Sequence, residues 1–170
     1  MTFEEFKTEL KNKRNFFYQF PWEVCTYFHW TAGSYTSTFN EYHFCILGDG
    51  RIVYTRPLDE TPQATWKRNT GNIAISLCCC YNATPDDLGD YPPTDAQIET
   101  SVKMIKAISE IFNLPIDYNH FMTHGEAADE DGYGLYSGDP DCRCDMHILK
   151  NGDEIGTGGE KLRQMARETV

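Results

Sequence analysis

The sequence predicts a single α/β domain in which helices flank one central mixed β-sheet. The chain has 170 residues, which is close to the commonest length of a single domain. Short segments rich in β-branched and aromatic residues alternate with segments of helical periodicity, and no repeat or low-complexity tract interrupts them. Because this alternation is typical of a sheet covered by helices, we expect one domain over residues 1–170.

The N-terminal region is expected to form a helix and then a strand. Thr2 and Glu5 fit a capping box, in which each side chain binds the backbone N–H of the other residue. The apolar residues that follow recur at helical spacing, which predicts a helix to about residue 14. Residues 23–29 are rich in β-branched and aromatic side chains and predict a strand.

The clearest local pattern is that of a β-hairpin. Residues 42–47 and 51–55 are both typical of strands, and they flank the turn sequence Gly48-Asp49-Gly50. Residues 72–78 predict a further strand, apolar enough to lie at the centre of its sheet. Residues 82–93 are dense in Pro, Gly and Asp and predict a loop.

The C-terminal half is expected to contain two helices and a short strand. Thr94 and Gln97 form a second capping-box pattern at the start of a helix. Its buried stripe is expected to consist of Ile98, Val102, Ile105, Ile108 and Ile111. Residues 118–123 predict a strand, residues 125–141 a long acidic and glycine-rich loop, and residues 161–168 a terminal helix.

The composition excludes several classes of partner. A net charge of −11 argues against nucleic acid, because a phosphate backbone repels an acidic surface. No apolar run approaches the ~20 residues that cross a bilayer, so membrane insertion is not expected. The N-terminus lacks the basic start and apolar stretch of a signal peptide, so we expect the chain to be cytoplasmic when made.

The seven cysteines are expected to be reduced thiols. Their number is odd, and three of them, Cys78 to Cys80, are adjacent on a predicted strand, where neighbours face opposite sides. A disulfide framework is therefore not expected, and these three side chains are interpreted as small buried hydrophobes.

Two histidines occupy matching positions in the predicted sheet. His29 and His124 each follow a short apolar strand and precede a turn of small residues. If the two strands are neighbours, both imidazoles emerge at one edge; otherwise each is a separate surface histidine. A zinc site would need at least a third protein ligand. Candidates in the sequence GDPDCRCDM are Asp139, Asp141, Cys142, Cys144 and Asp145.

Six short segments also occur in the order known from one enzyme family. They are FHWTAG, YHFCILGDGRIVYTR, RNTGNIAIS, PTDAQI, MTHGEA and RCD. With these segments the chain resembles the zinc-dependent N-acetylmuramoyl-L-alanine amidases of the type-2 class, which share a fold with phage amidase endolysins and animal peptidoglycan recognition proteins. The similarity covers residues 23–149. It leaves residues 1–20 as an N-terminal helix and residues 150–170 as a C-terminal extension.

The resemblance implies a Zn²⁺ site. The ligands that it implies are His29, His124 and Asp145. The third ligand in such enzymes is an Asp or Cys two positions after a basic residue, which is Arg143 in this chain. Cys142 and Cys144 are the rival candidates for that place.

The reaction that the resemblance implies is hydrolysis of the amide bond between N-acetylmuramic acid and L-alanine in peptidoglycan. Zinc would activate a water molecule and polarise the scissile carbonyl. Tyr42 would orient or deprotonate that water or hydrogen-bond the carbonyl, and Arg143 would hold the oxyanion. His43, the neighbour of Tyr42, would face the opposite side of its strand as a core histidine.

Substrate contacts and departures from the family pattern are also expected. The residues implied to contact the substrate are Trp30, Thr31, Trp66, Asn69 and Glu126. Glu126 is either an alternative general base or a solvated loop carboxylate. Ser76 stands where some relatives have a glutamate base, and Ala64-Thr65 precede Trp66 where relatives often have a histidine.

The function expected from these observations is that of a phage or prophage lytic enzyme, with peptidoglycan or a muropeptide as its substrate. It would be made in the cytoplasm and would act on the cell wall after release. Two alternatives remain open at this point. One is a non-catalytic module that binds muropeptides, and the other is a zinc hydrolase of a different amide or peptide bond.

Overall fold

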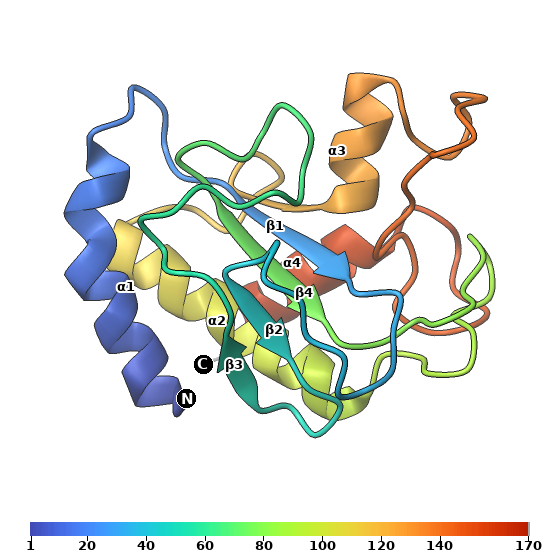
Figure 1. Cartoon of the computed structure of the whole chain (residues 1–170), viewed down its shortest axis with the longest axis horizontal. Helices are drawn as coiled ribbons and strands as arrows, with labels where there is room; N and C mark the ends of the chain where they lie inside the picture. Colours follow the sequence, from blue (N-terminus) through green and yellow to red (C-terminus); the bar gives the residue numbers. More distant parts are fainter. Residues whose placement is uncertain (170) are drawn as a thin grey trace.

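A five-stranded β-sheet runs through the centre of the computed structural model, which describes residues 1–169 (Figure 1). The strands are β1 (Thr26–Trp30), β2 (Phe44–Ile46), β3 (Ile52–Tyr54), β4 (Ile73–Leu77) and β5 (Phe121–Thr123). Their order across the sheet is β3-β2-β4-β1-β5. β2 and β3 pair antiparallel as the predicted hairpin, whereas all other neighbours are parallel. The predicted mixed α/β fold is therefore confirmed.

Four helices complete the fold. They are α1 (Phe3–Tyr18), α2 (Asp95–Phe112), α3 (His124–Asp131) and α4 (Gly158–Glu168). α2 contacts both α1 and α4, and α2 and α4 lie together on one face of the sheet (Figure 1). α3 begins directly after β5 and contacts both β5 and β1. No helix among residues 1–169 is both long and apolar enough to span a membrane.

Capping boxes set the starts of α1 and α2 as predicted. Thr2 with Glu5, and Thr94 with Gln97, exchange the two side-chain-to-backbone hydrogen bonds of this motif. The prediction that α1 ends near residue 14 was too short. α1 continues because Phe17 is buried and packs edge-to-face against Phe112 of α2, with ring centroids 5.6 Å apart.

Gln97 connects α2 to the sheet as well as capping it. Its side chain is fully buried, and Nε2 donates to the carbonyls of Ile46 and Cys78 at 3.0 and 2.9 Å. The Ile46 carbonyl also accepts the N–H of Cys78 at 2.9 Å, whereas the Cys78 carbonyl lies just beyond β4, which ends at Leu77. Oε1 accepts from the N–H of Thr94 at 3.0 Å, so one amide side chain binds three backbone groups.

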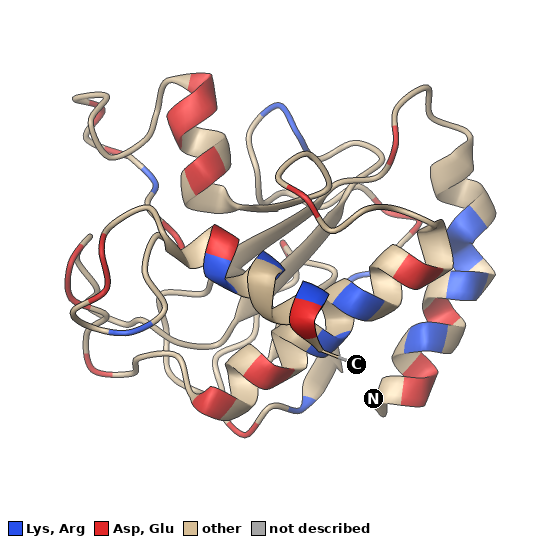
Figure 2. Cartoon of the chain, turned by 180° about the vertical axis from the view of Figure 1, so that it is seen from behind, with Lys and Arg blue, Asp and Glu red and all other residues tan. Residues whose placement is uncertain are grey.

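The predicted loop over residues 125–141 was wrong in its first half, where the structure has α3. Thr123 and Glu126 form a third capping box, a pattern present in the sequence that was overlooked. The helix ends at Gly132, whose φ of 85° lies in the left-handed region that glycine adopts without strain. The acidic positions of this helix are coloured red in Figure 2.

A buried ion pair fastens α4 to the start of α3. Arg163 donates from Nη1 and Nη2 to the two carboxylate oxygens of Glu126, both at 2.9 Å, and Nη1 also donates to the carbonyl of Phe121 at 2.9 Å. Only 4% of the Arg163 side chain and 11% of the Glu126 side chain are exposed. The interpretation of Glu126 as a solvated loop carboxylate is therefore wrong.

Cys78 to Cys80 and His43 are buried as predicted, although the three cysteines follow the end of β4 at Leu77 and do not lie on the strand. All seven thiols are free within the part of the chain that the structure describes, and Cys78 to Cys80 are fully buried. His43 is buried between backbone groups: Ala74 N–H donates to its Nδ1 at 3.1 Å, and its Nε2 lies 2.9 Å from the carbonyl of Glu60. Burial lowers the pKa of His43 to about 4.

Replacing Gln97 with methionine, which has a similar length, should lower the free energy of unfolding by about 2 kcal/mol, because the buried Cys78 carbonyl loses its donor and the Ile46 carbonyl keeps only the N–H of Cys78. Urea denaturation monitored by circular dichroism measures the change. The matched control is Gln164→Met on the exposed side of α4, where the amide binds only Glu168. Equal small changes in the two variants would contradict this role of Gln97.

Arg163→Met should lower the free energy of unfolding by about 3–5 kcal/mol, because Glu126 would keep a buried charge without its partner. Arg167→Met on the same helix is the control, since that side chain is 42% exposed and should cost less than about 1 kcal/mol. If Glu126→Gln in the Arg163→Met background recovers part of the lost free energy of unfolding, the unpaired charge of Glu126 is the cause of the loss. A loss no larger than that of the control would refute it.

Candidate active site

The parallel pairing of β1 with β5 brings two histidines together. Phe28 of β1 pairs with Thr123 of β5, so the next residues, His29 and His124, stand level at the same edge of the sheet. Their Nδ1 atoms are 3.1 Å apart, and both side chains are buried. The prediction that the two imidazoles emerge at one edge is confirmed.

Asp145 completes a compact group with these histidines. Its Oδ2 lies 3.4 Å from Nδ1 of His124 and 3.8 Å from Nδ1 of His29. The N–H of Trp30 donates to the same oxygen at 3.4 Å and helps to hold the carboxylate in place. One ligand atom from each of these three side chains lies within 4.8 Å of the other two, which is close enough for a shared metal ion. Among residues 1–169, no other group of His, Cys, Asp or Glu side chains meets this condition.

The pKa shifts of His29 and Asp145 both favour the form of the side chain that binds a metal. Burial lowers the pKa of His29 well below its ordinary value, and the neighbouring His124 adds to the effect, so the imidazole of His29 is neutral. Burial alone would raise the pKa of Asp145. The hydrogen bond and charge of His124 outweigh it and lower that pKa, so the carboxylate is ionised.

The spacing of the three atoms matches a tetrahedral metal site. Ligand atoms that lie about 2.0–2.1 Å from a tetrahedral ion are about 3.3 Å apart. The observed separations of 3.1, 3.4 and 3.8 Å bracket this value. Two nitrogen lone pairs facing each other repel unless a proton or a cation lies between them. The donor set of two imidazoles and one carboxylate therefore fits a divalent metal.

Neither rival thiol belongs to this group. Cys144 is half-buried and packs against the hydrophobic core, and burial raises its pKa to about 12. Cys142 lines the neighbouring cavity but offers no ligand atom near the two histidines. The geometry thus favours Asp145 over both cysteines.

The other nitrogen of each histidine contacts a hydroxyl group. Nε2 of His29 lies 3.1 Å from Oγ1 of Thr65, and Nε2 of His124 lies 3.3 Å from the phenol of Tyr133. Sequence reasoning identified neither residue as functional. Thr65 was noted only as a departure from the family pattern, and Tyr133 lies in a glycine-rich segment that carried no motif.

Two adjoining cavities of about 500 and 570 Å³ open onto the group, and His124 and Arg143 line both of them. Most of the predicted substrate-contact and catalytic residues are found here. The first cavity is lined by Trp66, Asn69 and Tyr133. The second is lined by Trp30, Thr31, Tyr42 and Asp145.

Tyr42 and Arg143 approach the group from different segments. The ring of Tyr42 lies 5.2 Å from the ring of His29, and burial, with the charge of Asp145, raises the pKa of its phenol. Arg143 is exposed at the shared wall of the two cavities, where its Nη1 donates to the carbonyl of Asp141 at 2.9 Å.

Glu126 and Ser76, which were considered in relation to the general base, line neither of the two cavities. Glu126 lines neither cavity, because Arg163 binds both of its carboxylate oxygens, so it takes no part in the candidate site. Ser76 pairs with His29 across β1 and β4 and is fully buried. No carboxylate therefore stands where some relatives have a glutamate base.

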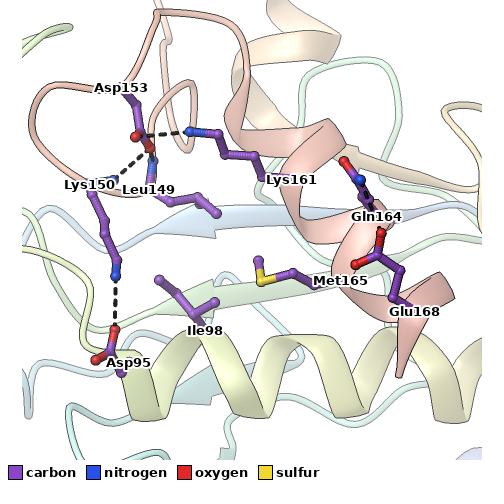
Figure 3. A pocket seen from close by; sticks show the side chains of 9 residues that line it. All are labelled: Asp95, Ile98, Leu149, Lys150, Asp153, Lys161, Gln164, Met165 and Glu168. Carbon is purple, nitrogen blue, oxygen red and sulfur yellow. Dashed lines mark hydrogen bonds and ion pairs between the residues drawn. The ribbon is translucent and has the colours of Figure 1, made fainter. Parts of the chain in front are cut away.

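A separate cavity of about 320 Å³ lies between α2, α4 and residues 149–153 (Figure 3). Its floor contains Ile98, Leu149 and Met165. Its lysines are paired with neighbouring carboxylates, Lys150 with Asp95 at 3.3 Å and Lys161 with Asp153 at 2.9 Å. None of the candidate site residues lines this cavity.

Comparisons with solved structures give distant matches. The endolysin N-acetylmuramoyl-L-alanine amidase LysCS from Clostridium intestinale URNW is 16% identical, with a TM-score of 0.48 over 62% of this chain and 72% of that one. The Ph2119 endolysin from Thermus scotoductus MAT2119 bacteriophage Ph2119 is 15% identical, with a TM-score of 0.46 over 68% of this chain and 84% of that one. No curated protein sequence matches the chain.

A family model gives the more extensive match. It is described as N-acetylmuramoyl-L-alanine amidase and matches residues 18–140, most of the chain. The matched range includes His29, Tyr42 and His124 and ends before Arg143 and Asp145, whose assignment depends on the geometry above. The predicted resemblance is confirmed, and the chain belongs to the N-acetylmuramoyl-L-alanine amidase family.

Proposed function

We propose that the protein hydrolyses the amide between N-acetylmuramic acid and L-alanine in peptidoglycan with a zinc ion held by His29, His124 and Asp145. Family membership supports the reaction. The observation that carries the metal assignment is the convergence of two Nδ1 atoms and one carboxylate oxygen within 4.8 Å beneath two cavities. Zinc is the metal proposed because two imidazoles and a carboxylate are among its usual ligand sets in hydrolases.

Zinc bound by these residues supplies a water of lowered pKa and a Lewis acid for the scissile carbonyl. The chain contributes the shape of the site and the burial of its ligands. His29, His124 and Asp145 are all at most 6% exposed, which limits competing contacts with bulk water. A low local dielectric strengthens each charge interaction that is made inside the site.

Arg143 is the residue proposed to hold the negative charge that develops on the carbonyl oxygen. It lines both cavities and is an exposed, flexible side chain, so it can reach an oxygen bound between the two. A donor aimed at a developing oxyanion lowers the barrier more than it stabilises the neutral substrate.

Tyr42, which lines the second cavity, is the residue proposed to donate a hydrogen bond to the water or to the scissile carbonyl. Because burial raises its pKa, the phenol keeps its proton at neutral pH. A protonated phenol orients a water or a carbonyl as a donor, and it is a poor general base. The two hydrogen-bonding roles predicted for Tyr42 are therefore favoured over deprotonation of the water.

The two cavities supply separate room for the groups on either side of the amide. They share Gln63, Ala64, His124 and Arg143 and otherwise differ in lining. Trp66 in the first cavity is 56% exposed and presents an aromatic surface of the kind that packs against sugars and peptides. We further infer a lytic role in a phage or prophage, which follows the resemblance to phage amidases.

Purified protein should contain about one zinc per chain, and chelation should abolish release of stem peptides from sacculi until zinc is restored. Asp145→Ala and His124→Ala should lose both zinc and activity, because each removes one ligand. Cys144→Ala should keep the zinc, since its thiol packs against the core. Metal content by mass spectrometry, measured beside activity, checks these outcomes.

A zinc-loaded protein that cleaves no sacculi would contradict the proposed reaction and favour a binding module. Faster cleavage of a plain peptide than of a muramoyl-peptide of the same sequence would instead indicate a hydrolase of another bond.

Arg143→Met should lower kcat about 100-fold with unchanged zinc content, because it removes the donor for the oxyanion. Arg143→Lys should recover part of the loss, since it restores the charge without the planar guanidinium. Steady-state kinetics on a soluble muramoyl-peptide separates kcat from KM. An effect confined to KM would assign Arg143 to substrate binding instead.

A further inference from the structure

We propose that Thr65 and Tyr133 are positioning residues that orient His29 and His124 toward the metal, each through a hydrogen bond to an imidazole Nε2. This inference rests on the proposed zinc site. A histidine that binds a metal through one ring nitrogen usually donates the N–H of its other nitrogen to an acceptor, and the two hydroxyls are the proposed acceptors. Both contacts lie outside the group of three ligands, and both are made by hydroxyl groups.

The contact between Thr65 and His29 is buried. Both residues are 1% exposed, and the distance from Oγ1 to Nε2 is 3.1 Å. A neutral imidazole carries its proton on one nitrogen only, so a proton on Nε2 leaves the Nδ1 lone pair free for a metal. Among the hydrogen bonds of residues 1–169, the Thr65 hydroxyl has no partner other than this imidazole.

The backbone around Thr65 is held in place by one side chain. Oδ1 of Asn69 accepts the N–H groups of Ala64 and Thr65 at 3.0 and 2.8 Å. The N–H of Arg68 also donates to the carbonyl of Thr65 at 2.9 Å. These bonds close a tight turn, and the Thr65 hydroxyl therefore faces His29 from a fixed position. Asn69, which was expected to contact substrate, shapes this turn and also lines the first cavity.

Tyr133 makes the equivalent contact with His124. Its phenol lies 3.3 Å from Nε2, and its ring packs edge-to-face against Trp66 with centroids 5.6 Å apart. Its backbone is fixed on both sides: its N–H donates to Ala128 of α3 at 3.0 Å, and its carbonyl accepts from Arg143 at 3.0 Å. The same residue thus connects a metal ligand to the segment that carries the proposed oxyanion donor.

The two contacts have one consequence in common. An imidazole whose Nε2 lies against a fixed hydroxyl has its ring orientation set, and when Nδ1 binds the metal that hydroxyl accepts the remaining proton on Nε2. A hydroxyl can accept this proton, whereas the methyl group of valine and the bare ring of phenylalanine cannot. The hydroxyls therefore act on metal affinity without touching the metal.

Thr65→Val and Tyr133→Phe test this proposal because each removes a hydroxyl with little change of shape. The zinc dissociation constant, measured by competition with a chromophoric chelator, should rise about tenfold in each variant. Thr65→Ser should restore the wild-type value, because it keeps the hydroxyl. The matched controls are Thr61→Val and Tyr136→Phe, both at exposed positions, and they should bind zinc as the wild type does.

A nuclear magnetic resonance measurement separates positioning from general stability. In zinc-loaded wild type, both ligand imidazoles should give Nε2–H protons that exchange slowly with water. Thr65→Val should lose this protection at His29 alone, and Tyr133→Phe should lose it at His124 alone. A merely structural role would change the thermal midpoint without this selectivity.

The outcomes distinguish this inference from the proposed function. Zinc affinity and ring-proton exchange that match wild type in both variants, with wild-type protein that binds zinc and cleaves sacculi, would overturn the positioning role alone. Wild-type protein that binds no zinc would overturn both.

Discussion

The parallel pairing of β1 with β5 is the constraint on which the rest of the site depends. It sets His29 and His124 level at one sheet edge, although 94 residues separate them in the sequence. A slip of one residue in this register would turn one imidazole to the other face of the sheet. The apolar contacts of β1, which is buried along its whole length, therefore fix the distance between two Nδ1 atoms.

The C-terminal helix α4 supports the pairing of β1 with β5 through contacts of Arg163. Arg163 of α4 binds the carboxylate of Glu126 and the carbonyl of Phe121, so it contacts both the start of α3 and the strand before it. Glu126 in turn caps the helix whose first residue is His124. Through Glu126, the C-terminal helix thus supports the helix that begins at His124, although α4 lies beyond the range of the family match.

Local patterns predicted local structure well. The two recognised capping boxes and the hairpin around Gly48 to Gly50 were visible because their residues lie within a few positions of one another. The same kind of pattern at Thr123 and Glu126 was overlooked because acidic and glycine-rich composition favoured a loop. His29, His124 and Asp145 came from residue context and family resemblance. Thr65 and Tyr133 could not be predicted, because their contacts depend on how loops from different parts of the chain meet over the sheet.

The most direct test of the central claim is anomalous diffraction at the zinc absorption edge from crystals grown with the metal. One strong peak is expected within about 2.0–2.2 Å of Nδ1 of His29, Nδ1 of His124 and a carboxylate oxygen of Asp145. A peak coordinated by Cys142 or Cys144 in place of Asp145, or by either imidazole through Nε2, would contradict it.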